Sequence, residues 1–431
     1  MKNRLLSFVR RVSIQLAAAG FLLLGVVTLA QAQTFTVLHN FTNGEDGAVP
    51  YAGVTLDQVG RLYGTTNGAT LGNGTVYRMV HQGGGWIIEP LDGFHDSDGA
   101  RPESRVVFGP QGWLYGTTER GGSQGAGVIY DLHPSPTICR SVLCLWDEDV
   151  LHQMLIAQGY NLDYGDLAFD ADGNVYGTAE LDGGTCVGSP PGGGGGPEGN
   201  VYRLIKSNGV WSEQILWNFE DASSGAQPMS GVIRDAAGKL YGTTIACGDP
   251  QCNHQGTVFE LTEQLGMCWA EQTLHAFAID GSEGANPIAG LVMDAAGNFY
   301  GATAQKGPNG GGTIFELSPT NGGWNFQVIY ALTGSGYTAG PWRTLMMDSA
   351  GSLYGTNYTS GAFGYGSVFK LSHGSGGWTY TSLHDFSGSD GAYPLSNVVM
   401  DANGNLYGTA SAGGTGSECQ GGCGVVWEIT P

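Results

Sequence analysis

The chain has 431 residues, and only 13% of them are charged, against about 25% in an average soluble protein. It carries 38 acidic and 17 basic residues, a net charge of −21. A chain this acidic lacks the basic face that nucleic acids and anionic lipid surfaces require, so both are excluded as partners. The 75 glycines and the shortage of strong helix formers favour a turn-rich, all-β fold.

The first 32 residues have the pattern of a secretory signal peptide. The basic residues come first, at Lys2, Arg4, Arg10 and Arg11. An apolar stretch over residues 12–29 follows, and Ala30-Gln31-Ala32 is a small-residue cleavage site. A retained membrane anchor is the alternative. Cleavage would remove four of the 17 basic residues and leave a mature chain, 33–431, with a net charge of −25. We therefore expect a secreted or periplasmic protein with no membrane contact after cleavage.

One short phrase returns seven times along the mature chain: a large apolar residue, then Tyr and Gly, then Thr or Ala. Its tyrosines are Tyr63, Tyr115, Tyr176, Tyr241, Tyr300, Tyr354 and Tyr407. Neighbouring copies lie 52 to 65 residues apart. A residue present in every copy is expected to serve the repeat itself, so the phrase informs the fold before it informs function.

Each copy predicts four short antiparallel strands, A to D. In the last copy, residues 396–401 and 406–409 flank a tight turn with Gly404, and residues 424–429 form a third strand. The preceding copy supplies strands over residues 367–371 and 378–386. Four strands in each unit of this length are the pattern of a β-propeller blade. The sequence therefore predicts an all-β, seven-bladed β-propeller that occupies residues 33–431 as one domain.

The two ends of the chain predict how the ring closes. The last copy stops after strand C and has no strand D. Residues 35–41 at the mature N-terminus are similar to the D strands at 273–277 and 382–386. We therefore expect the N-terminal strand to complete the seventh blade and cover an otherwise exposed sheet edge.

Eight cysteines in an exported chain predict disulfides. Three close pairs could each staple one loop: Cys139 with Cys144, Cys247 with Cys252, and Cys419 with Cys423. Cys186 and Cys268 are left without an assigned partner. The chain has no CxxC motif, so a structural metal held by cysteines is disfavoured.

Three phrases, D-x-x-G-N-L-Y-G-T-T, G-T-V-F-x-L and D-G-A-x-P, together resemble the Gloeo/Verruco tandem repeat, also called GloVer. The best matches are residues 294–301, 401–409 and 256–261. The resemblance covers essentially the whole mature chain. It implies a family of exported bacterial proteins, but no activity that can be carried over to particular residues.

Most repeated polar residues have structural interpretations. The A–B turns carry an aspartate that can cap the turn, at Asp57, Asp170, Asp235, Asp294, Asp348 and Asp401. One acid in each turn is too few for a typical calcium loop. Histidines recur on strand D, at His39, His152, His275 and His384, where we expect a polar rim rather than catalysis. Asp46, Asp98 and Asp390 in the D–A connections can cap their loops, and a shallow cation site there is the alternative. We assign no metal site and no cofactor, and only weak calcium binding is left open.

Positions at which the copies differ are better candidates for a site. The residue before each strand A should approach the mouth of the central channel, and in turn it is Tyr51, Glu103, Tyr164, Met229, Ile288, Trp342 and Leu395. One B–C loop adds Tyr358, Phe363 and Tyr365 to the same face. We therefore select Tyr51, Glu103, Tyr164, Trp342, Tyr358 and Tyr365 as ligand-binding candidates. Packing beneath the loops is the alternative interpretation.

Signatures of catalysis are missing from the sequence. The HExxH signature of zinc proteases does not occur, and no catalytic residue is assigned. We expect an exported, monomeric binding or scaffolding protein whose partner is a glycan or an envelope protein. The alternatives are an extracellular propeller enzyme that uses acids such as Glu103 and Asp163, and a purely structural envelope protein.

Overall fold

The computed structural model describes residues 33–68, 72–135, 146–156, 160–162, 164–181, 183, 186, 198–219, 222–249, 251–253, 255–264, 266, 268–334 and 339–431. The predicted signal peptide, Asp163 and the pair Cys139/Cys144 lie outside the described residues. A compact unit extends from Phe35 to Thr430. No helix among the described residues is long and apolar enough to span a membrane.

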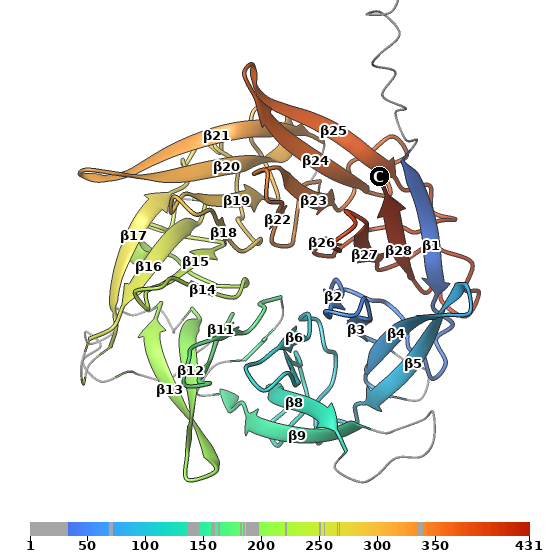
Figure 1. Cartoon of the computed structure of the whole chain (residues 1–431). Helices are drawn as coiled ribbons and strands as arrows, with labels where there is room; N and C mark the ends of the chain where they lie inside the picture. Colours follow the sequence, from blue (N-terminus) through green and yellow to red (C-terminus); the bar gives the residue numbers. More distant parts are fainter. Residues whose placement is uncertain are drawn as a thin grey trace, which may run out of the picture. The chain divides into compact units, whose positions relative to one another are not determined.

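The described strands form seven antiparallel sheets of four, arranged as the blades of a β-propeller (Figure 1). Blade 1 is β2 (Thr55–Leu56), β3 (Leu62–Thr66), β4 (Thr75–Gln82) and β5 (Gly85–Gly93). Blade 2 is β6 (Val107–Phe108), β7 (Leu114–Thr117), β8 (Val128–Pro134) and β9 (Trp146–Gln153). Blade 3 is β10 (Ala168–Phe169), β11 (Val175–Ala179), β12 (Asn200–Ser207) and β13 (Val210–Asn218). The predicted fold class is confirmed.

The second half of the chain repeats this arrangement. Blade 4 follows the short 3₁₀ helix η2 (Ala222–Ser224) and is β14 (Ile233–Arg234), β15 (Leu240–Thr244), β16 (Thr257–Thr262) and β17 (Ala270–Ala276). Blade 5 is β18 (Val292–Met293), β19 (Phe299–Thr303), β20 (Gly310–Thr320) and β21 (Gly323–Thr333). Blade 6 is β22 (Met346–Met347), β23 (Leu353–Asn357), β24 (Ser367–Gly374) and β25 (Gly377–Asp385). Blade 7 is β26 (Val399–Met400), β27 (Leu406–Ala410), β28 (Val425–Thr430) and β1 (Thr34–Asn40).

Blade 7 combines the two ends of the chain. Its strand order is β1-β28-β27-β26, so the N-terminal strand occupies the strand-D place beside the last strand (Figure 1). Phe35 on β1 stacks on His384 of blade 6, with ring centroids 3.6 Å apart. In the other direction, the Thr409 hydroxyl of blade 7 donates to the Ala52 carbonyl of blade 1 at 2.7 Å. This arrangement agrees with the predicted closure of the ring.

The glycine of the repeated phrase is required by an aromatic side chain on strand C. A Cβ at any of the seven glycines would lie 2.3–2.8 Å from that side chain, which is closer than real Cβ contacts. The aromatic residues are Tyr77, Tyr130, Tyr202, Phe259, Phe315, Phe369 and Trp427. Each lies directly opposite its glycine in the antiparallel register, as Gly177 and Tyr202 do. The glycine thus makes room for a large ring that fills the space between neighbouring blades.

The threonine of the phrase fastens each blade to the next. Thr65 donates to the Ser104 carbonyl at 3.1 Å, and Thr178 donates to the Ser230 carbonyl at 2.8 Å. Thr117, Thr243, Thr356 and Thr409 make equivalent bonds to the loop before the next strand A. The exception is blade 5, where Ala302 has no hydroxyl.

The same bonds account for one difference from the sequence prediction. Strand A was expected over 396–401 in the last copy, but β26 contains only Val399 and Met400. The carbonyl of Ser396 accepts a hydrogen bond from Thr356 of the preceding blade. The loop before strand A therefore bonds across the blade junction, and only its last residues pair with strand B.

The tyrosine of the phrase is bonded to the A–B turn, as in blade 4. The Asp235 carboxylate accepts the backbone N–H of Ala237 and of Lys239, both at 2.9 Å, and the Tyr241 hydroxyl at 3.1 Å. Five other blades repeat these bonds around Asp57, Asp170, Asp294, Asp348 and Asp401. Blade 2 has Gly109 at this place, and Tyr115 donates to Gln111 instead. These aspartates act as turn caps.

Candidate functional site

The channel mouth is formed by the D–A connections and the B–C loops, because both leave the same end of each antiparallel blade. Tyr51, Glu103, Tyr164 and Trp342 each lie in a D–A connection, four positions before the first residue of strand A. Tyr358 and Tyr365 lie in the B–C loop of blade 6, between β23 and β24. All six predicted residues therefore belong to one face of the propeller.

Arg343 lies at the centre of this mouth. Its guanidinium donates to the carbonyls of Leu395 at 3.1 Å, Tyr164 at 2.9 Å and Glu103 at 2.7 Å, and to the Tyr51 carbonyl at 3.3 Å. Only 5% of Arg343 is exposed. One side chain from blade 6 thus binds the backbones of blades 1, 2, 3 and 7, using the rigid fork of donors that only arginine offers.

Arg343 departs from the repeat in a way that the sequence could have revealed. The equivalent residues of the other blades are all small: Ala52, Ser104, Gly165, Ser230, Ala289 and Ser396. The preceding blade has Ala302 in place of the threonine that, in five other blades, bonds the backbone carbonyl at this position. A single arginine among six small residues indicates a side chain that fills the space the others leave.

An aromatic row extends outward from Arg343 across blades 3, 6 and 7. The guanidinium carbon lies 4.4 Å from the ring centroid of Tyr164, within cation–π distance. The ring of Tyr164 is followed by Trp342 at 6.2 Å, Tyr358 at 5.5 Å, Tyr393 at 5.3 Å and Tyr365 at 6.0 Å. We call these five side chains the aromatic row.

The exposed end of the row is in the B–C loop of blade 6. Tyr365 is 39% exposed, and Phe363 beside it is 62% exposed. Tyr358 and Tyr393 are half-buried. Tyr393 was missed in the sequence because it belongs to an Asp-Gly-Ala-Tyr-Pro stretch that was interpreted only as a loop cap. It has a left-handed backbone, with φ of 56°, and its N–H donates to the Tyr365 carbonyl at 2.8 Å.

Glu103 is the acid of the mouth, and it is 8% exposed. Its carboxylate accepts a hydrogen bond from Asn67, which follows β3 of blade 1. Burial, together with the charge of Glu119, raises the pKa of Glu103 to about 7, although Arg343 and Arg101 act in the opposite direction. Burial and the charge of Glu103 also raise the pKa of Tyr51. Glu103 is thus a carboxyl group that changes its protonation state near neutral pH.

The structure brings the six predicted residues together in two ways. Tyr51, Glu103 and Tyr164 converge through their carbonyls on Arg343. Trp342, Tyr358 and Tyr365 belong to the aromatic row, and Tyr164 contributes to both groups.

Hollows also lie away from the mouth. Residues in or next to strands A of blades 1, 2, 6 and 7, among them Thr55, Arg105 and Met346, line a hollow of about 530 Å³ on the A–B side of the channel. A hollow of about 900 Å³ separates the A–B turns of blades 1 and 2 and includes Tyr63 and Arg78. Its wall includes Pro134 and Trp146, which border residues outside the described set, so we assign no site there. Among the described residues, Arg343 and the carbonyls that it binds occupy the centre of the mouth.

The strand-D histidines are bonded to acids of the rim. His39 Nε2 lies 2.9 Å from Asp46, His384 Nε2 lies 3.0 Å from Asp390, and His275 Nε2 lies 2.9 Å from Glu283. His275 also stacks on Phe326 of the next blade at 3.8 Å. His152 lies 3.7 Å from Glu213 of blade 3. These residues fix the outer rim and do not approach the channel mouth.

Disulfides hold three of the loops. The structure joins Cys247 to Cys252 and Cys419 to Cys423, in the pairs that the spacing predicts. It also joins Cys186 to Cys268, which were left unassigned and which link blade 3 to blade 4. Their 82-residue separation gives no local signal in the sequence. Three disulfides among the described residues indicate that the chain folds in an oxidising compartment.

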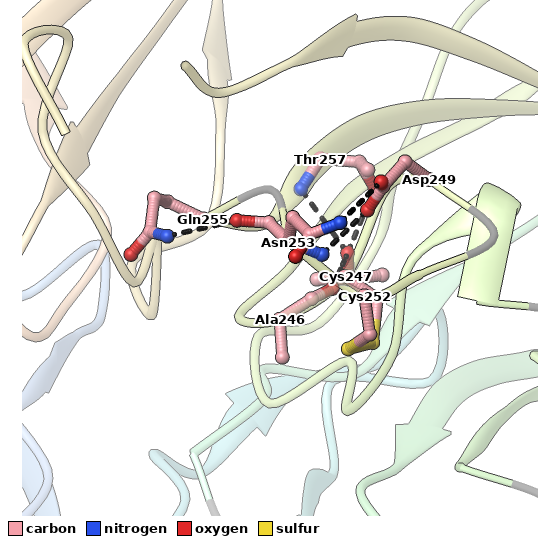
Figure 2. Close-up of a disulfide and its surroundings, with 8 residues drawn as sticks. Ala246, Cys247, Asp249, Cys252, Asn253, Gln255 and Thr257 are labelled. Carbon is pink, nitrogen blue, oxygen red and sulfur yellow. Dashed lines mark hydrogen bonds between the residues drawn. A yellow bond between two sulfur atoms is a disulfide. The ribbon is translucent and has the colours of Figure 1, made fainter. Parts of the chain in front are cut away.

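Figure 2 shows the disulfide in the B–C loop of blade 4. Within the five-residue span between its cysteines, the Asp249 carbonyl accepts the Cys252 N–H at 2.9 Å. The Asp249 carboxylate accepts two further bonds from Asn253, at 2.5 and 3.0 Å. Gln255 then connects this loop to Lys306 of blade 5 at 2.6 Å. The B–C loop of blade 4 is thus held by its own disulfide and by a bond to blade 5.

Comparison with protein families gives the lineage of the chain. The family model of the Gloeobacter/Verrucomicrobia repeat matches residues 25–251 and 235–431. The chain belongs to this family. The resemblance that the sequence predicts is therefore confirmed, and the two matches cover both halves of this Gloeobacter/Verrucomicrobia repeat protein. No curated protein matches its sequence.

Solved structures similar to this repeat protein are propellers of low sequence identity. A fungal alcohol oxidase of the AA5 family, in complex with copper, matches with a TM-score of 0.53 and 12% identity, over 93% of this chain and 77% of the oxidase. The PQQ-bound aldose sugar dehydrogenase of Streptomyces coelicolor matches with a TM-score of 0.42 and 11% identity, over 92% and 98%. A luciferin-regenerating enzyme gives 0.40 and 13%, over 93% and 96%. At 12% identity, the likeness to the oxidase shows the fold alone.

Proposed function

We propose that this propeller is an exported binding module, secreted or periplasmic, that recognises a glycan through the aromatic row at its channel mouth. The observation that carries the proposal is the continuity of the row. Five rings follow one another at 5.3–6.2 Å from Tyr164 to Tyr365, and the end of the row reaches solvent. Tyrosine and tryptophan offer a flat apolar face with a polar edge, which suits the alternating CH and OH groups of a sugar ring.

The position of the row in the repeat supports the same proposal. The repeated residues cap turns, pack between blades and bond one blade to the next, whereas the row consists of residues that differ from copy to copy. Arg343 holds the inner end in place by four bonds to carbonyls. A platform that is already ordered binds with less loss of side-chain entropy.

A glycan array with the purified mature chain, residues 33–431, tests the proposal. We expect binding to a limited set of glycans and loss of these signals in Tyr365→Ala and Tyr358→Ala. Val59→Ala is the matched control, since Val59 is 75% exposed on an A–B turn of the opposite face. A wild-type protein that binds no glycan, or variants that bind as well as wild type, would overturn the proposal. Capture of an envelope protein by a glycan-negative chain would favour the scaffolding alternative.

One observation, made at Glu103, supports the enzyme alternative. A carboxyl group with a pKa raised to about 7 by burial is suited to general acid catalysis at neutral pH. Glycoside hydrolysis needs a second carboxylate within about 5–10 Å. The second acid expected from the sequence, Asp163, lies outside the described residues. Incubation of the bound glycan with wild type and with Glu103→Gln decides this alternative: release of shorter sugars by wild type only would support it, and intact glycan would contradict it.

A further inference from the structure

Blade 2 differs from the other blades on one face of its outer strands. Asp131 and His133 lie two residues apart on β8, so their side chains share a face of the sheet. Asp149 on β9 is the direct cross-strand partner of Asp131. A ligand atom from each of the three lies within 4.8 Å of the others. His133 Nε2 is 3.4 Å from an Asp149 oxygen.

The equivalent cross-strand pair is compatible in charge in five other blades. Arg78 donates to Glu89 in blade 1 at 2.5 Å, and Arg203 donates to Gln214 in blade 3 at 2.7 Å. The remaining pairs are Glu260/Gln272, Glu316/Gln327 and Lys370/Thr381. Blade 2 instead places two carboxylates opposite each other. Like charges in this position destabilise a sheet, so this blade carries a cost that these five avoid.

Asp131 is also buried without adequate compensation. It is 2% exposed, and its Oδ1 has no hydrogen-bond partner among the described residues. Lys206 of blade 3 is near enough to act electrostatically on Asp131, but its ammonium group lies over the Trp211 ring at 5.2 Å. A buried carboxylate oxygen with no partner is costly unless an unseen group satisfies it. A positive ion would satisfy this oxygen and would at the same time bind the histidine and the second carboxylate.

We propose that Asp131, His133 and Asp149 bind a divalent transition-metal ion, for which Zn²⁺ is the best match. Zinc takes imidazole nitrogen and carboxylate oxygen together, and three protein ligands leave a position for water. The Asp149 side chain is 68% exposed, so that position faces solvent. Tetrahedral ligands at about 2.0–2.2 Å from zinc lie about 3.4 Å apart, and His133 Nε2 and the nearest Asp149 oxygen are already separated by 3.4 Å.

The neighbouring side chains would hold this site in shape. The Trp113 ring packs on His133 with centroids 4.5 Å apart, which fixes the imidazole. The site lies toward the C–D end of the blade, away from the channel mouth, and it does not depend on the proposed glycan binding. The cysteines and the single aspartate of each A–B turn predict no metal site. The three residues proposed here come together only when the facing residues of strands C and D are compared.

Isothermal titration of ZnCl₂ into the metal-free mature chain tests the proposal. The protein must carry no polyhistidine tag, because the tag would bind zinc itself. We expect one equivalent to bind to wild type. Removal of a residue that only orients a metal ligand typically weakens metal affinity by roughly 10- to 100-fold. Asp131→Asn and His133→Gln remove ligands themselves, so each should weaken zinc binding by at least this factor. His81→Gln removes an exposed histidine of blade 1 and should bind as wild type does.

Thermal unfolding separates loss of the site from loss of the fold. Asp149→Asn removes an exposed charge that faces another carboxylate, so without metal its Tm should equal or exceed that of wild type. Added Zn²⁺ should raise the Tm of wild type and leave that of Asp149→Asn unchanged. No heat of binding in wild type, or equal affinity in wild type and all three ligand variants, would overturn the proposal.

Discussion

The inner strands of this propeller depend on contacts that recur from blade to blade, whereas its channel mouth depends on a residue that occurs in one blade only. On the inner strands, Tyr, Gly and Thr make nearly the same three contacts in each blade: with a turn aspartate, with a strand-C ring and with the next blade. At the mouth, one residue, Arg343, is unlike its six counterparts and bonds four other blades at once. The comparison teaches that repetition builds the ring, while a single departure from repetition organises the face available to a ligand.

The difference also has an energetic side. A contact made in six or seven places can lose one copy and leave the rest intact, since distant contacts contribute additively. A contact made once has no substitute. We therefore expect the mouth to be less tolerant of substitution at Arg343 than any one blade is at its repeated phrase.

The largest effect is expected for Arg343→Met. This change keeps the length of the side chain but leaves four carbonyls without their donor in a region that is almost closed to water. A buried carbonyl left without its donor costs about 1–3 kcal/mol, and four carbonyls are affected, so we expect the free energy of unfolding to fall by about 3–5 kcal/mol in urea denaturation. Arg120→Met is the control, because the Arg120 side chain is 58% exposed and its ion pair with Glu119 lies at the surface. Equal stabilities of the two variants would break the comparison.

Gly177→Ala should come next. The new Cβ would lie 2.3 Å from the Tyr202 hydroxyl, and the strand-C ring is fully buried and cannot move away. Overpacking of this kind costs about 1–3 kcal/mol, measurable as a lower denaturation midpoint. Gly374→Ala, where a Cβ meets nothing within 4 Å, should differ from wild type by less than about 0.5 kcal/mol. A Gly177→Ala protein as stable as wild type would show that the glycine is not needed for packing.

Glu103 should make stability depend on pH. Its pKa is raised in the folded state from 4.5 to about 7, first by burial. The folded chain therefore holds a proton that the unfolded chain has released, so this contribution is present in full below about pH 4.5 and is lost as pH rises toward 7. The slope for one proton is at most about 1.4 kcal/mol per pH unit. Urea denaturation from pH 4 to 8 should show a flatter profile for Glu103→Gln, and an unchanged profile would contradict this assignment.

The smallest effect is expected for one blade junction. Thr178→Val keeps the shape of the side chain but removes the bond to the Ser230 carbonyl at 2.8 Å. A single buried hydrogen bond contributes about 0.5–1.5 kcal/mol. The reverse change, Ala302→Thr, should leave the free energy of unfolding unchanged, because Arg343 lies where the other blades have a small residue. A higher free energy of unfolding for Ala302→Thr would show that blade 5 only lacks the hydroxyl that bonds each other blade to the next.

The ring could be predicted from the sequence because its causes are local and repeated. Each Tyr-Gly-Thr phrase, each A–B turn and the similarity between residues 35–41 and the D strands can be read within one blade. The mouth residues Tyr51, Glu103, Tyr164 and Trp342 could be predicted for the same reason, since each occupies an equivalent place before strand A.

The remaining features depend on which groups meet across the ring. Arg343 bonds residues as far as 292 positions away, and no local pattern indicates that distance. The pairing of Cys186 with Cys268 needs the neighbouring positions of blades 3 and 4. The facing pair Asp131/Asp149 becomes unusual only when strands C and D are aligned in register and compared with the other blades.

One measurement tests the central claim, that the repeated residues build the ring and the residues that differ bind the ligand. It is the affinity of the best glycan from the array for wild type, Tyr358→Ala and Thr178→Val, determined by isothermal titration at a temperature where all three are folded. We predict a loss of at least about tenfold, or 1.4 kcal/mol, for Tyr358→Ala and an unchanged affinity for Thr178→Val. Full affinity in Tyr358→Ala, or an equal loss in both variants, would contradict the account.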